Sequence, residues 1–508
     1  MSSEYPLVLF YLQCTPTLTI PDPSASTSLK RTGFFLGPLL FLVIILFVDP
    51  DLIAPGATKV MAVGVFMITW WITEAVPNPV AALLPLILFP ALGVMSMTNS
   101  AAPYANPSVF LFMGGFLIAL ALEKHRLHER IAINLIRLTG TSGNGIILGF
   151  TLSSGLISMW ISNTATALMM LPIGVSVIQL LKRSEGDQPM SKGEKNFALG
   201  LMLSIGYAAS LGGMATIIGT PPNVVFSGFA KEFYNQDISF FRWMVIGVPL
   251  AMVTMFACYF MITRLLFPNK LPKIEGSELL ISNKLKELGV MRKEEKLTLF
   301  VFALTSFFWI FQQPLNALFG AEIFNDTNVA VTGGVLMFLV PVNFKSDEFL
   351  ITWEDTKKLP WGILILFGGG ISLARGMEST GIIKAIGASI ASQQGVSIWT
   401  MMFLLTLASV VLTEFMSNVA LVTIFIPVVF GIAEGLHFDP YILALPVTFA
   451  ASCAFMFPIS TPPNAIVFAS GHIKMNEMIK AGFLLDLLCM IIIFIFSVIF
   501  FSNFSLVI

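Results

Sequence analysis

The chain has 508 residues, of which 56% are hydrophobic and only 11% are charged, and its formal net charge is −1. Soluble domains carry about 25% charged residues, so this composition predicts a polytopic membrane protein. The balanced charge gives no sign of nucleic-acid binding. The phosphate-binding motif GxxxxGK[ST] does not occur in the sequence, so we expect no ATP-driven engine within the chain.

We expect an all-α fold in which eleven apolar segments cross the membrane. A crossing helix needs about 20 apolar residues. Residues 1–32 are interpreted as an N-terminal tail, and residues 33–56 contain the first transmembrane helix. The ten further candidate crossings are 57–73, 78–95, 106–122, 196–230, 241–267, 297–313, 328–343, 362–376, 442–470 and 481–503.

Two other apolar segments, 143–181 and 397–435, are too long for one crossing and too interrupted for two. Each has a Ser-Asn pair at its middle, Ser162-Asn163 in the first and Ser417-Asn418 in the second. We interpret both as re-entrant hairpins that enter and leave on one side, with the polar pair at the tip. Non-helical backbone at membrane depth is tolerated where protein or a water-filled cavity surrounds it.

The distribution of lysine and arginine supports this layout. Cytoplasmic segments of membrane proteins are enriched in both residues. If the N-terminus is cytoplasmic, 23 of the 28 basic residues fall on the inside. The five that fall outside are Lys59, Lys231, Arg242, Arg375 and Lys384. Counting either hairpin as a full crossing would move the downstream loops to the other side and weaken this bias.

Three features occur twice in the same order, which indicates an internal repeat. The segment VFLFMGGFLIA at 109–119 matches ILILFGGGISL at 363–373. The two Ser-Asn hairpins follow. After them, GTPPN at 219–223 matches STPPN at 460–464. Small polar residues and paired prolines are unusual in membrane helices, so their double occurrence predicts one site built from two repeats.

The predicted layout makes the two repeats inverted. The first repeat, 57–267, starts outside and ends inside, and its hairpin 143–181 faces the cytoplasm. The second repeat, 297–503, starts inside and ends outside, and its hairpin 397–435 faces the exterior. The charged segment 268–296 is then a cytoplasmic linker between them. Inverted repeats of this kind are typical of secondary transporters.

Each hairpin tip combines groups that attract an anion with groups that attract a small cation. The second arm begins with unpaired backbone N–H groups and the positive end of the helix dipole, which favour an anion. Asn163, Asn418 and Thr164 add side-chain donors. The first arm ends in unpaired carbonyl oxygens, and the prolines of the two TPPN segments free further ones. Hydroxyls four residues apart can face one point on a helix, and two such pairs occur here: Ser158 with Ser162, and Thr413 with Ser417.

These motifs resemble the divalent anion:sodium symporter family, the INDY-type transporters. The resemblance rests on the tip and TPPN motifs, on WWITEAVPNPVAALLP at 70–85 and on LPWGILILFGGG at 359–370, and it covers nearly all of 57–503. It implies a Na⁺-coupled carrier of C4-dicarboxylates such as succinate, fumarate and malate, with citrate as a further candidate. It also implies a homodimer in the lipid bilayer, in which a transport domain slides past a scaffold as an elevator.

The resemblance assigns roles to individual residues. It implies one sodium site from Ser158, Ser162, Asn163 and Gly219, and a second from Thr413, Met416, Asn418 and Ser460. It places the substrate against Asn163, Thr164, Asn418 and Val419, with Thr220, Pro221, Thr461 and Pro462 nearby. Val419 departs from the family pattern, because the more symmetric version of the motif has threonine there. Substrate preference is therefore left open, as is the alternative of a dicarboxylate exchanger that works without sodium.

Two carboxyl residues lie in apolar segments outside these motifs, and such groups tend to be paired or functional. Glu414 adjoins the second tip, where it could tune cation affinity, form a structural ion pair or be a protonated acid. Asp486 could pair across helices, but the sequence identifies no partner for it.

An enzyme and an anion channel are the alternatives from other classes. His128-Glu129 begins the zinc motif HExxH, but Ala132 stands at its last position. A channel needs a continuous polar path, whereas the polar residues here gather near one depth. We therefore expect a carrier, and the resemblance implies Na⁺ as its coupling ion and no organic cofactor. The small number of cysteines and the compact loops favour a bacterial inner membrane.

Overall fold

The computed structural model describes residues 23–49, 53–184, 190–345, 347–391 and 397–503. These ranges are almost entirely helical, with one two-stranded antiparallel sheet that pairs β1 (Pro341–Asn343) with β2 (Glu348–Phe349). The first helix, α2 (Pro23–Phe47), begins within the segment interpreted as a tail. The rest of that segment, residues 1–22, lies outside the described residues.

Eight helices in the described part of the chain are long and apolar enough to cross a membrane: Ser28–Phe47, Met97–Lys124, Asn163–Leu181, Lys192–Gly213, Phe240–Leu266, Lys293–Phe319, Asn418–Gly435 and Met475–Ser502. Shorter apolar helices lie between them, and several predicted crossings are divided into two helices. The structure thus confirms a helical, polytopic membrane protein, but helix length alone does not establish eleven crossings.

The elements of the first half run from α3 to η2. They are α3 (Ala57–Thr73), α4 (Asn78–Ala81), α5 (Leu84–Ala91), α6 (Met97–Ala101), η1 (Ala102–Ala105), α7 (Pro107–Lys124), α8 (Leu127–Leu138), α9 (Gly143–Ser158), α10 (Asn163–Ser184), α11 (Lys192–Gly213), α12 (Pro221–Tyr234), α13 (Phe240–Phe260) and the π-helical turn η2 (Met261–Leu266). Helix α14 (Ser277–Leu288) lies in the predicted linker.

The second half contains a matching series. Its elements are α15 (Lys293–Phe319), α16 (Asp326–Leu339), the two short strands, η3 (Trp353–Lys358), α17 (Trp361–Ser379), α18 (Ile382–Ala391), α19 (Ile398–Thr413), α20 (Asn418–Gly435), α21 (Pro440–Ala450), α22 (Pro462–Phe468) and α23 (Met475–Asn503). In both halves a glycine-containing helix (α7, α17) precedes a short helix, a two-armed hairpin, a broken helix and a long final helix. This is the order that the repeated motifs predict.

Proline determines where the second part of each broken helix begins. Pro221 is the first residue of α12, and Pro462 is the first residue of α22. Proline suits this position because the first turn of a helix has no partner for its N–H groups. The preceding residues, Thr220 and Thr461, are both extended, with φ of −143° and −140°. The two breaks therefore share one backbone conformation.

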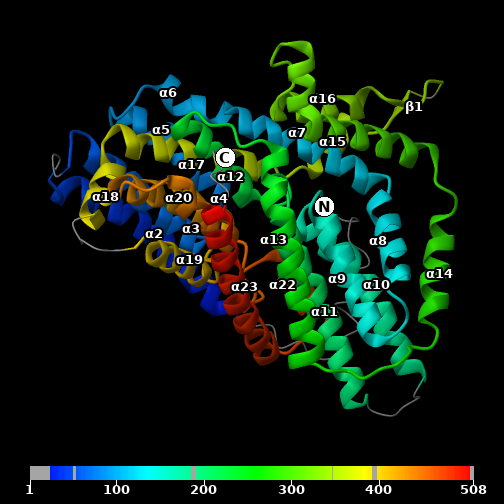
Figure 1. The fold of residues 1–508 in the computed structure, drawn as a ribbon. Coiled ribbons are helices and arrows are strands. Elements are labelled where there is room, and N and C mark those ends of the chain that lie inside the picture. Colours follow the sequence, from blue (N-terminus) through cyan, green and yellow to red (C-terminus); the bar gives the residue numbers. More distant parts are fainter. Residues whose placement is uncertain (1–22, 50–52, 185–189, 346, 392–396, 504–508) are drawn as a thin grey trace.

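The two halves interlock through their broken helices. The first part of each broken helix, α11 or α21, packs against both arms of the hairpin in its own half. The second part packs against the other half, because α22 contacts α10 and α12 contacts α20. In Figure 1, α9–α11 lie on one side of the central helices α13 and α23, and α18–α20 lie on the other side. The interlocked breaks join these two groups.

Candidate binding site at the two hairpin tips

The first hairpin tip lies against the break between α11 and α12. The Ser158 hydroxyl, at the end of α9, donates a hydrogen bond of 2.6 Å to Asn163 Oδ1, at the start of α10. A methyl carbon on Gly213 would lie 2.6 Å from Asn163 Oδ1 and 3.2 Å from the Cβ of Thr220. Gly219 in turn lies against the backbone of Gly213. Four predicted site residues of the first half are thus brought together.

The hydroxyl of Thr216 connects this tip to the break. It donates a hydrogen bond of 2.5 Å to the carbonyl of Met159 in the turn of the hairpin. It also accepts one of 3.0 Å from the backbone N–H of Gly219. Because Thr216 is fully buried, these bonds are shielded from solvent and hold the turn and the break in one arrangement.

The second hairpin tip repeats the same contact. The Thr413 hydroxyl, at the end of α19, approaches Asn418 Oδ1 at 2.9 Å and the carbonyl of Ala451 at 2.6 Å. Its single proton is shared between these two acceptors. Asn418 is the fifth residue after Thr413, as Asn163 is the fifth residue after Ser158. Each tip therefore pairs a buried hydroxyl with the carboxamide that begins the second arm.

The second tip has a further connection that the first tip lacks. Glu414, which is only 2% exposed, accepts backbone hydrogen bonds from Phe455 at 2.7 Å and Met456 at 3.0 Å. Its other oxygen accepts a bond of 2.7 Å from the hydroxyl of Ser460. At the matching positions of the first half stand Met159 and Gly219, which offer no such groups.

The asparagines of the two TPPN segments close the two breaks in the same way. The Asn223 amide donates to the carbonyls of Gly213 at 3.1 Å and Thr216 at 2.7 Å, ten and seven residues earlier. The Asn464 amide donates to the carbonyls of Ala454 at 2.9 Å and Phe457 at 3.2 Å, again ten and seven residues earlier. Both asparagines are fully buried, so each can hold its irregular segment in place. The sequence shows these asparagines as part of the repeated motif but does not predict this role.

The remaining predicted site residues lie at the tips with different surroundings. Thr164, Met416 and Val419 are half-buried, as is Pro221, while Thr461 is buried and Pro462 is exposed. Ser162 is exposed, and its hydroxyl accepts a hydrogen bond of 3.2 Å from the N–H of Ala165. This bond caps the first turn of α10. The structure thus gives Ser162 a capping contact rather than one with Ser158.

The chemistry of the tips suits a small hard cation next to an anion. Hydroxyl, carboxamide and backbone carbonyl oxygens are neutral ligands of the kind that hard cations prefer. The helices α10 and α20 begin at Asn163 and Asn418, so the positive ends of their dipoles lie at the tips, where they favour negative charge. Sequence reasoning did not single out Gly213, whose lack of a side chain leaves room for the Asn163 carboxamide.

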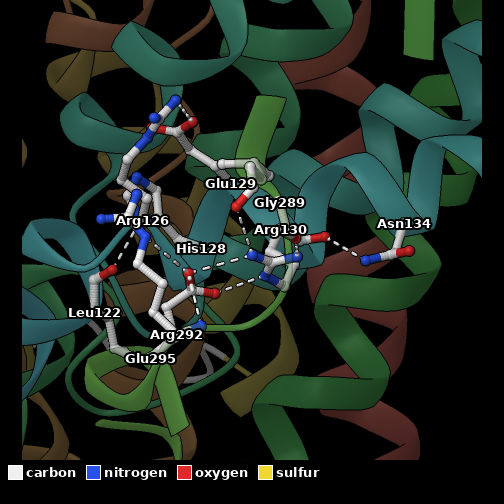
Figure 2. Close-up of polar contacts among 10 residues, drawn as sticks. Leu122, Arg126, His128, Glu129, Arg130, Asn134, Gly289, Arg292 and Glu295 are labelled. Carbon is white, nitrogen blue, oxygen red and sulfur yellow. Dashed lines mark hydrogen bonds and ion pairs between the residues drawn. The ribbon is translucent and has the colours of Figure 1, made fainter. Parts of the chain in front are cut away.

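A second polar cluster lies where α8 meets the start of α15 (Figure 2). Arg130 donates to the carboxylate of Glu295 at 2.6 Å and to the carbonyl of Gly289 at 3.0 Å. The side chains of this ion pair are 14% exposed on Arg130 and 5% exposed on Glu295. A cavity of about 330 Å³ lies beside this cluster and is lined by Lys124, His125, Arg126, Arg292, Glu294, Glu295, Val342, Glu348 and Phe349.

Helix α8, which carries one side of this cluster, is amphipathic. It buries Leu127, Ala132, Ile133 and Ile136 and leaves its other face exposed, as a helix at a membrane interface does. Through Arg130 it is connected to α15, so this cluster is a structural junction that is separate from the hairpin tips.

Comparison with known proteins connects this arrangement to a family. The family described as the sodium:sulfate symporter transmembrane region matches residues 30–507. A Staphylococcus saprophyticus protein named sodium-dependent dicarboxylate transporter SdcS is 39% identical over 467 residues, which cover 91% of this chain and 90% of that protein. The Staphylococcus aureus protein of the same name is 38% identical over 465 residues, covering 91% of this chain and 89% of its own length.

Two solved structures share the fold at low sequence identity. The Alcanivorax borkumensis YdaH transporter has a TM-score of 0.57 and 13% identity, with 95% of this chain and 98% of that chain covered. Neisseria gonorrhoeae MtrF has a TM-score of 0.52 and 12% identity, with 95% of each chain covered. At these identities the likeness supports the membrane-transporter fold alone.

Proposed function

Because the chain belongs to the sodium:sulfate symporter family, as the resemblance of its motifs predicted, we propose that it is a secondary transporter that couples sodium entry to the uptake of C4-dicarboxylates. Succinate, fumarate and malate are the proposed substrates, with citrate as a further candidate. Relatives that are 38–39% identical over nearly their full length are named sodium-dependent dicarboxylate transporters. This similarity supports the substrate class for the present chain.

The observation that carries the proposal is the doubled hydroxyl–carboxamide pair at the tips. Ser158 with Asn163, and Thr413 with Asn418, each lie beside a broken helix. We assign one sodium ion to the first pair, with Ser162 and Gly219 as further ligands. We assign a second sodium ion to the second pair, with Met416 and Ser460. Side chains and backbone carbonyls would both contribute oxygen ligands.

The substrate would lie between the two tips. One carboxylate would meet Asn163 and Thr164, and the other would meet Asn418 next to Val419. The remaining contacts are proposed to come from the two TPPN segments, through Thr220, Pro221, Thr461 and Pro462. A carboxylate in this place gains the helix dipoles of α10 and α20. Two sodium ions nearby would balance its charge without a buried lysine or arginine.

The proposed mechanism begins with sodium binding, which orders the tips before the dicarboxylate binds. The ions and the substrate share Asn163 and Asn418, so neither tip is complete for the anion until the cation is in place. We further propose that the two halves are inverted repeats, and that the hairpins and broken helices slide as a unit past a scaffold in a homodimer. The membrane would be the bacterial plasma membrane.

Uptake of labelled succinate into proteoliposomes tests the proposal. With sodium outside, uptake should be saturable, and replacing sodium by potassium should remove it. Unlabelled fumarate and malate should compete, and sulfate is included as a competitor because of the family name. If no di- or tricarboxylate is taken up or competes, the substrate class is wrong.

Two alternative functions give different results in the same assay. A sodium-independent exchanger would take up succinate in potassium and would be accelerated by unlabelled dicarboxylate inside the vesicles. An anion channel would show uptake that follows the membrane potential and does not saturate. Either result would replace the symport proposal.

A further inference from the structure

One ion pair joins the hairpins and broken helices to the rest of the chain. The guanidinium of Arg375, on α17, donates to both carboxylate oxygens of Glu232, on α12, and the Nη2–Oε2 distance is 2.9 Å. Pairs in which both oxygens are bonded are stronger and more directional than single contacts. The side chains are 35% exposed on Arg375 and 11% exposed on Glu232, so water only partly screens the pair.

The other ion pairs that the structure describes do not make this connection. Five of them are local, with partners three or six residues apart in the chain. Three join elements outside the hairpins and broken helices: Lys30 with Glu74, Lys124 with Asp355, and Arg130 with Glu295. Within the described residues, the Arg375–Glu232 pair is therefore the ion pair that ties the proposed sliding unit to its surroundings.

Helix α17 is anchored on one side to elements that precede the first hairpin. A methyl carbon on Gly369 would lie 2.1 Å from the carbonyl oxygen of Ala82, directly after α4, so the two backbones are in contact. The Ser372 hydroxyl donates a hydrogen bond of 3.1 Å to the carbonyl of Ser100 in α6. Since α17 is neither a hairpin arm nor part of a broken helix, these contacts assign it to the scaffold.

The side of α17 that meets α12 and α20 is packed through apolar groups. The ring of Phe367 lies on α12 at Gly228, where an added methyl carbon would be 2.1 Å from the ring. The methyl group of Thr423, on α20, lies in the same way on Gly370 of α17. Thr423 is only 2% exposed, so the interface is closed in this structure. Apolar packing is non-directional and permits sliding, whereas the ion pair specifies one position.

Helix α12 is in turn connected to the second hairpin. The hydroxyl of Tyr234, the last residue of α12, donates a hydrogen bond of 2.8 Å to the carboxylate of Glu434 near the end of α20. The ring of Tyr234 also packs on Phe430 of α20, with ring centroids 5.0 Å apart. Glu232 lies two residues before Tyr234, so a bond from α17 to Glu232 acts on both halves of the sliding unit.

We propose that the Arg375–Glu232 ion pair is a latch that holds the sliding unit in the position seen in this structure and opens in each transport cycle. The latch rests on the sliding motion of the proposed function. Its two bonds form when Glu232 is level with Arg375 and break once α12 moves beyond the reach of the guanidinium. Both partners lie near helix ends, where water can hydrate them after the pair opens, so the latch is weak enough to open repeatedly.

A disulfide across the interface tests whether α17 and α20 must part. In Gly370→Cys with Thr423→Cys the two Cβ positions are 3.3 Å apart, near the spacing of about 3.8 Å in disulfides. Oxidation should lower succinate uptake at least about 20-fold, because the unit can no longer slide, and reduction should restore uptake. Full uptake by the oxidised protein, or failure of the disulfide to form, would overturn the latch.

The matched control is a disulfide between two helices outside the sliding unit. In Gly334→Cys with Leu117→Cys the Cβ positions are 3.2 Å apart, between α16 and α7. Oxidation of this protein should leave uptake within about twofold of its reduced form. An equal loss of uptake in the two disulfide proteins would show that the α17–α20 interface has no special part in the motion, and would also overturn the latch.

The labelling rate of a buried thiol measures how often the interface opens. Thr423→Cys places one thiol there, in a Cys14→Ser background, and N-ethylmaleimide is the probe. Adding Glu232→Gln or Arg375→Gln should raise the labelling rate about fivefold, the effect of losing one partly shielded ion pair. Exchanging the charges, with Glu232→Arg and Arg375→Glu together, should return the rate to within about twofold of the starting protein.

Two controls distinguish an opened latch from a generally loosened protein. Labelling of the buried native thiols, resolved by peptide mass spectrometry, should stay the same in Glu232→Gln; these are Cys258, Cys453 and Cys489. Asp355→Asn, which breaks the ion pair with Lys124 outside the sliding unit, should leave labelling at position 423 unchanged. A labelling rate that Glu232→Gln does not raise, or a rise that the exchanged charges do not reverse, would overturn the latch. If Glu232→Gln does not fold, Arg375→Gln and the exchanged pair decide.

Failure of the proposed function gives a different result. The unsubstituted protein would then show no sodium-driven dicarboxylate uptake, while labelling of Thr423→Cys would still respond to the charges at positions 232 and 375.

Discussion

The hydroxyl of Ser460 donates a 2.7 Å hydrogen bond to the carboxylate of Glu414, and this bond crosses from the second broken helix to the tip of the second hairpin. The first half has Gly219 and Met159 at the matching positions. There the connection is made instead by Thr216, which contacts the carbonyl of Met159. The two halves thus reach the same arrangement of tip and break with different chemistry, and of the two tips the second uses a buried carboxyl group.

Replacing Asn163, whose carboxamide begins the second arm of the first hairpin, should abolish sodium binding and substrate binding together. Asn163→Ala deletes the acceptor of the Ser158 hydroxyl and a proposed ligand of both sodium and dicarboxylate. We expect sodium-driven succinate uptake to fall by at least about 100-fold, the effect of losing contacts of about 3 kcal/mol. The measurement is uptake together with sodium-dependent thermal stabilisation in detergent. The control is Asn134→Ala on α8, where the side chain is exposed and donates to the carbonyl of Arg130 on the same helix. Undiminished transport by Asn163→Ala would show that the tip assignment is wrong.

A single methyl group at Gly213 should have a similar effect without removing any ligand. In Gly213→Ala the new carbon would lie 2.6 Å from Asn163 Oδ1, closer than van der Waals contact allows, so the carboxamide must move. We expect sodium affinity to fall at least about tenfold, because a shift of about 1 Å is enough to disrupt ligand geometry. Sodium titration of uptake measures it.

The matched control for Gly213→Ala is Gly64→Ala. Its added carbon would lie 3.5 Å from a methyl group of Leu373, which is an ordinary contact. Uptake by Gly64→Ala should therefore be close to that of the unsubstituted protein. Equal sodium affinity in the two variants would mean that Gly213 does not shape the first tip.

The sequence predicted the order of the elements well because that order depends on a few strong local signals. Pro221 and Pro462 suit the first position of a helix and disfavour a helix that continues from the preceding residues. The Ser-Asn pairs interrupt apolar segments that would otherwise continue. The start of α2 at Pro23 was not predicted, because residues 23–32 are too polar to resemble a membrane crossing even though they continue the helix. Helix formation and membrane insertion are separate properties, and hydropathy reports mainly the second.

Contacts between distant segments were harder to predict. Asn223 and Asn464 were visible as repeated residues, but their bonds to carbonyls ten residues earlier depend on the path of the irregular backbone. Glu414 stands out in the sequence as a carboxyl residue in an apolar segment. Its hydrogen-bond partners Phe455, Met456 and Ser460 lie 41, 42 and 46 residues further along the chain, and no periodicity in the sequence indicates those contacts.

The ion pair between Arg130 and Glu295 should stabilise the junction of α8 with α15 (Figure 2). Glu295→Gln leaves Arg130 without its charged partner at a site where the glutamate side chain is only 5% exposed. We expect the free energy of unfolding to fall by about 2 kcal/mol. Glu287→Gln is the control, because Glu287 is 59% exposed and its pair with Lys284 should contribute less than about 0.5 kcal/mol. Thermal unfolding in detergent compares the stabilities of the two variants. An equal loss of stability in both would show that the Arg130–Glu295 pair contributes no more than an exposed pair.

Val419 should determine how the second tip discriminates among dicarboxylates. It is half-buried in the first turn of α20, where the first hairpin has Thr164. Val419→Thr keeps the shape of the side chain and adds a hydroxyl that can bond to a hydroxylated substrate. We expect uptake of malate relative to succinate to rise about fivefold, which corresponds to one added hydrogen bond of about 1 kcal/mol. The sodium concentration for half-maximal uptake should stay unchanged, since Val419 is not a proposed sodium ligand. Val428→Thr, also half-buried on α20 but further from the tip, should leave the ratio as it is. A malate-to-succinate ratio that moves equally in both variants, or in neither, would remove Val419 from the substrate site.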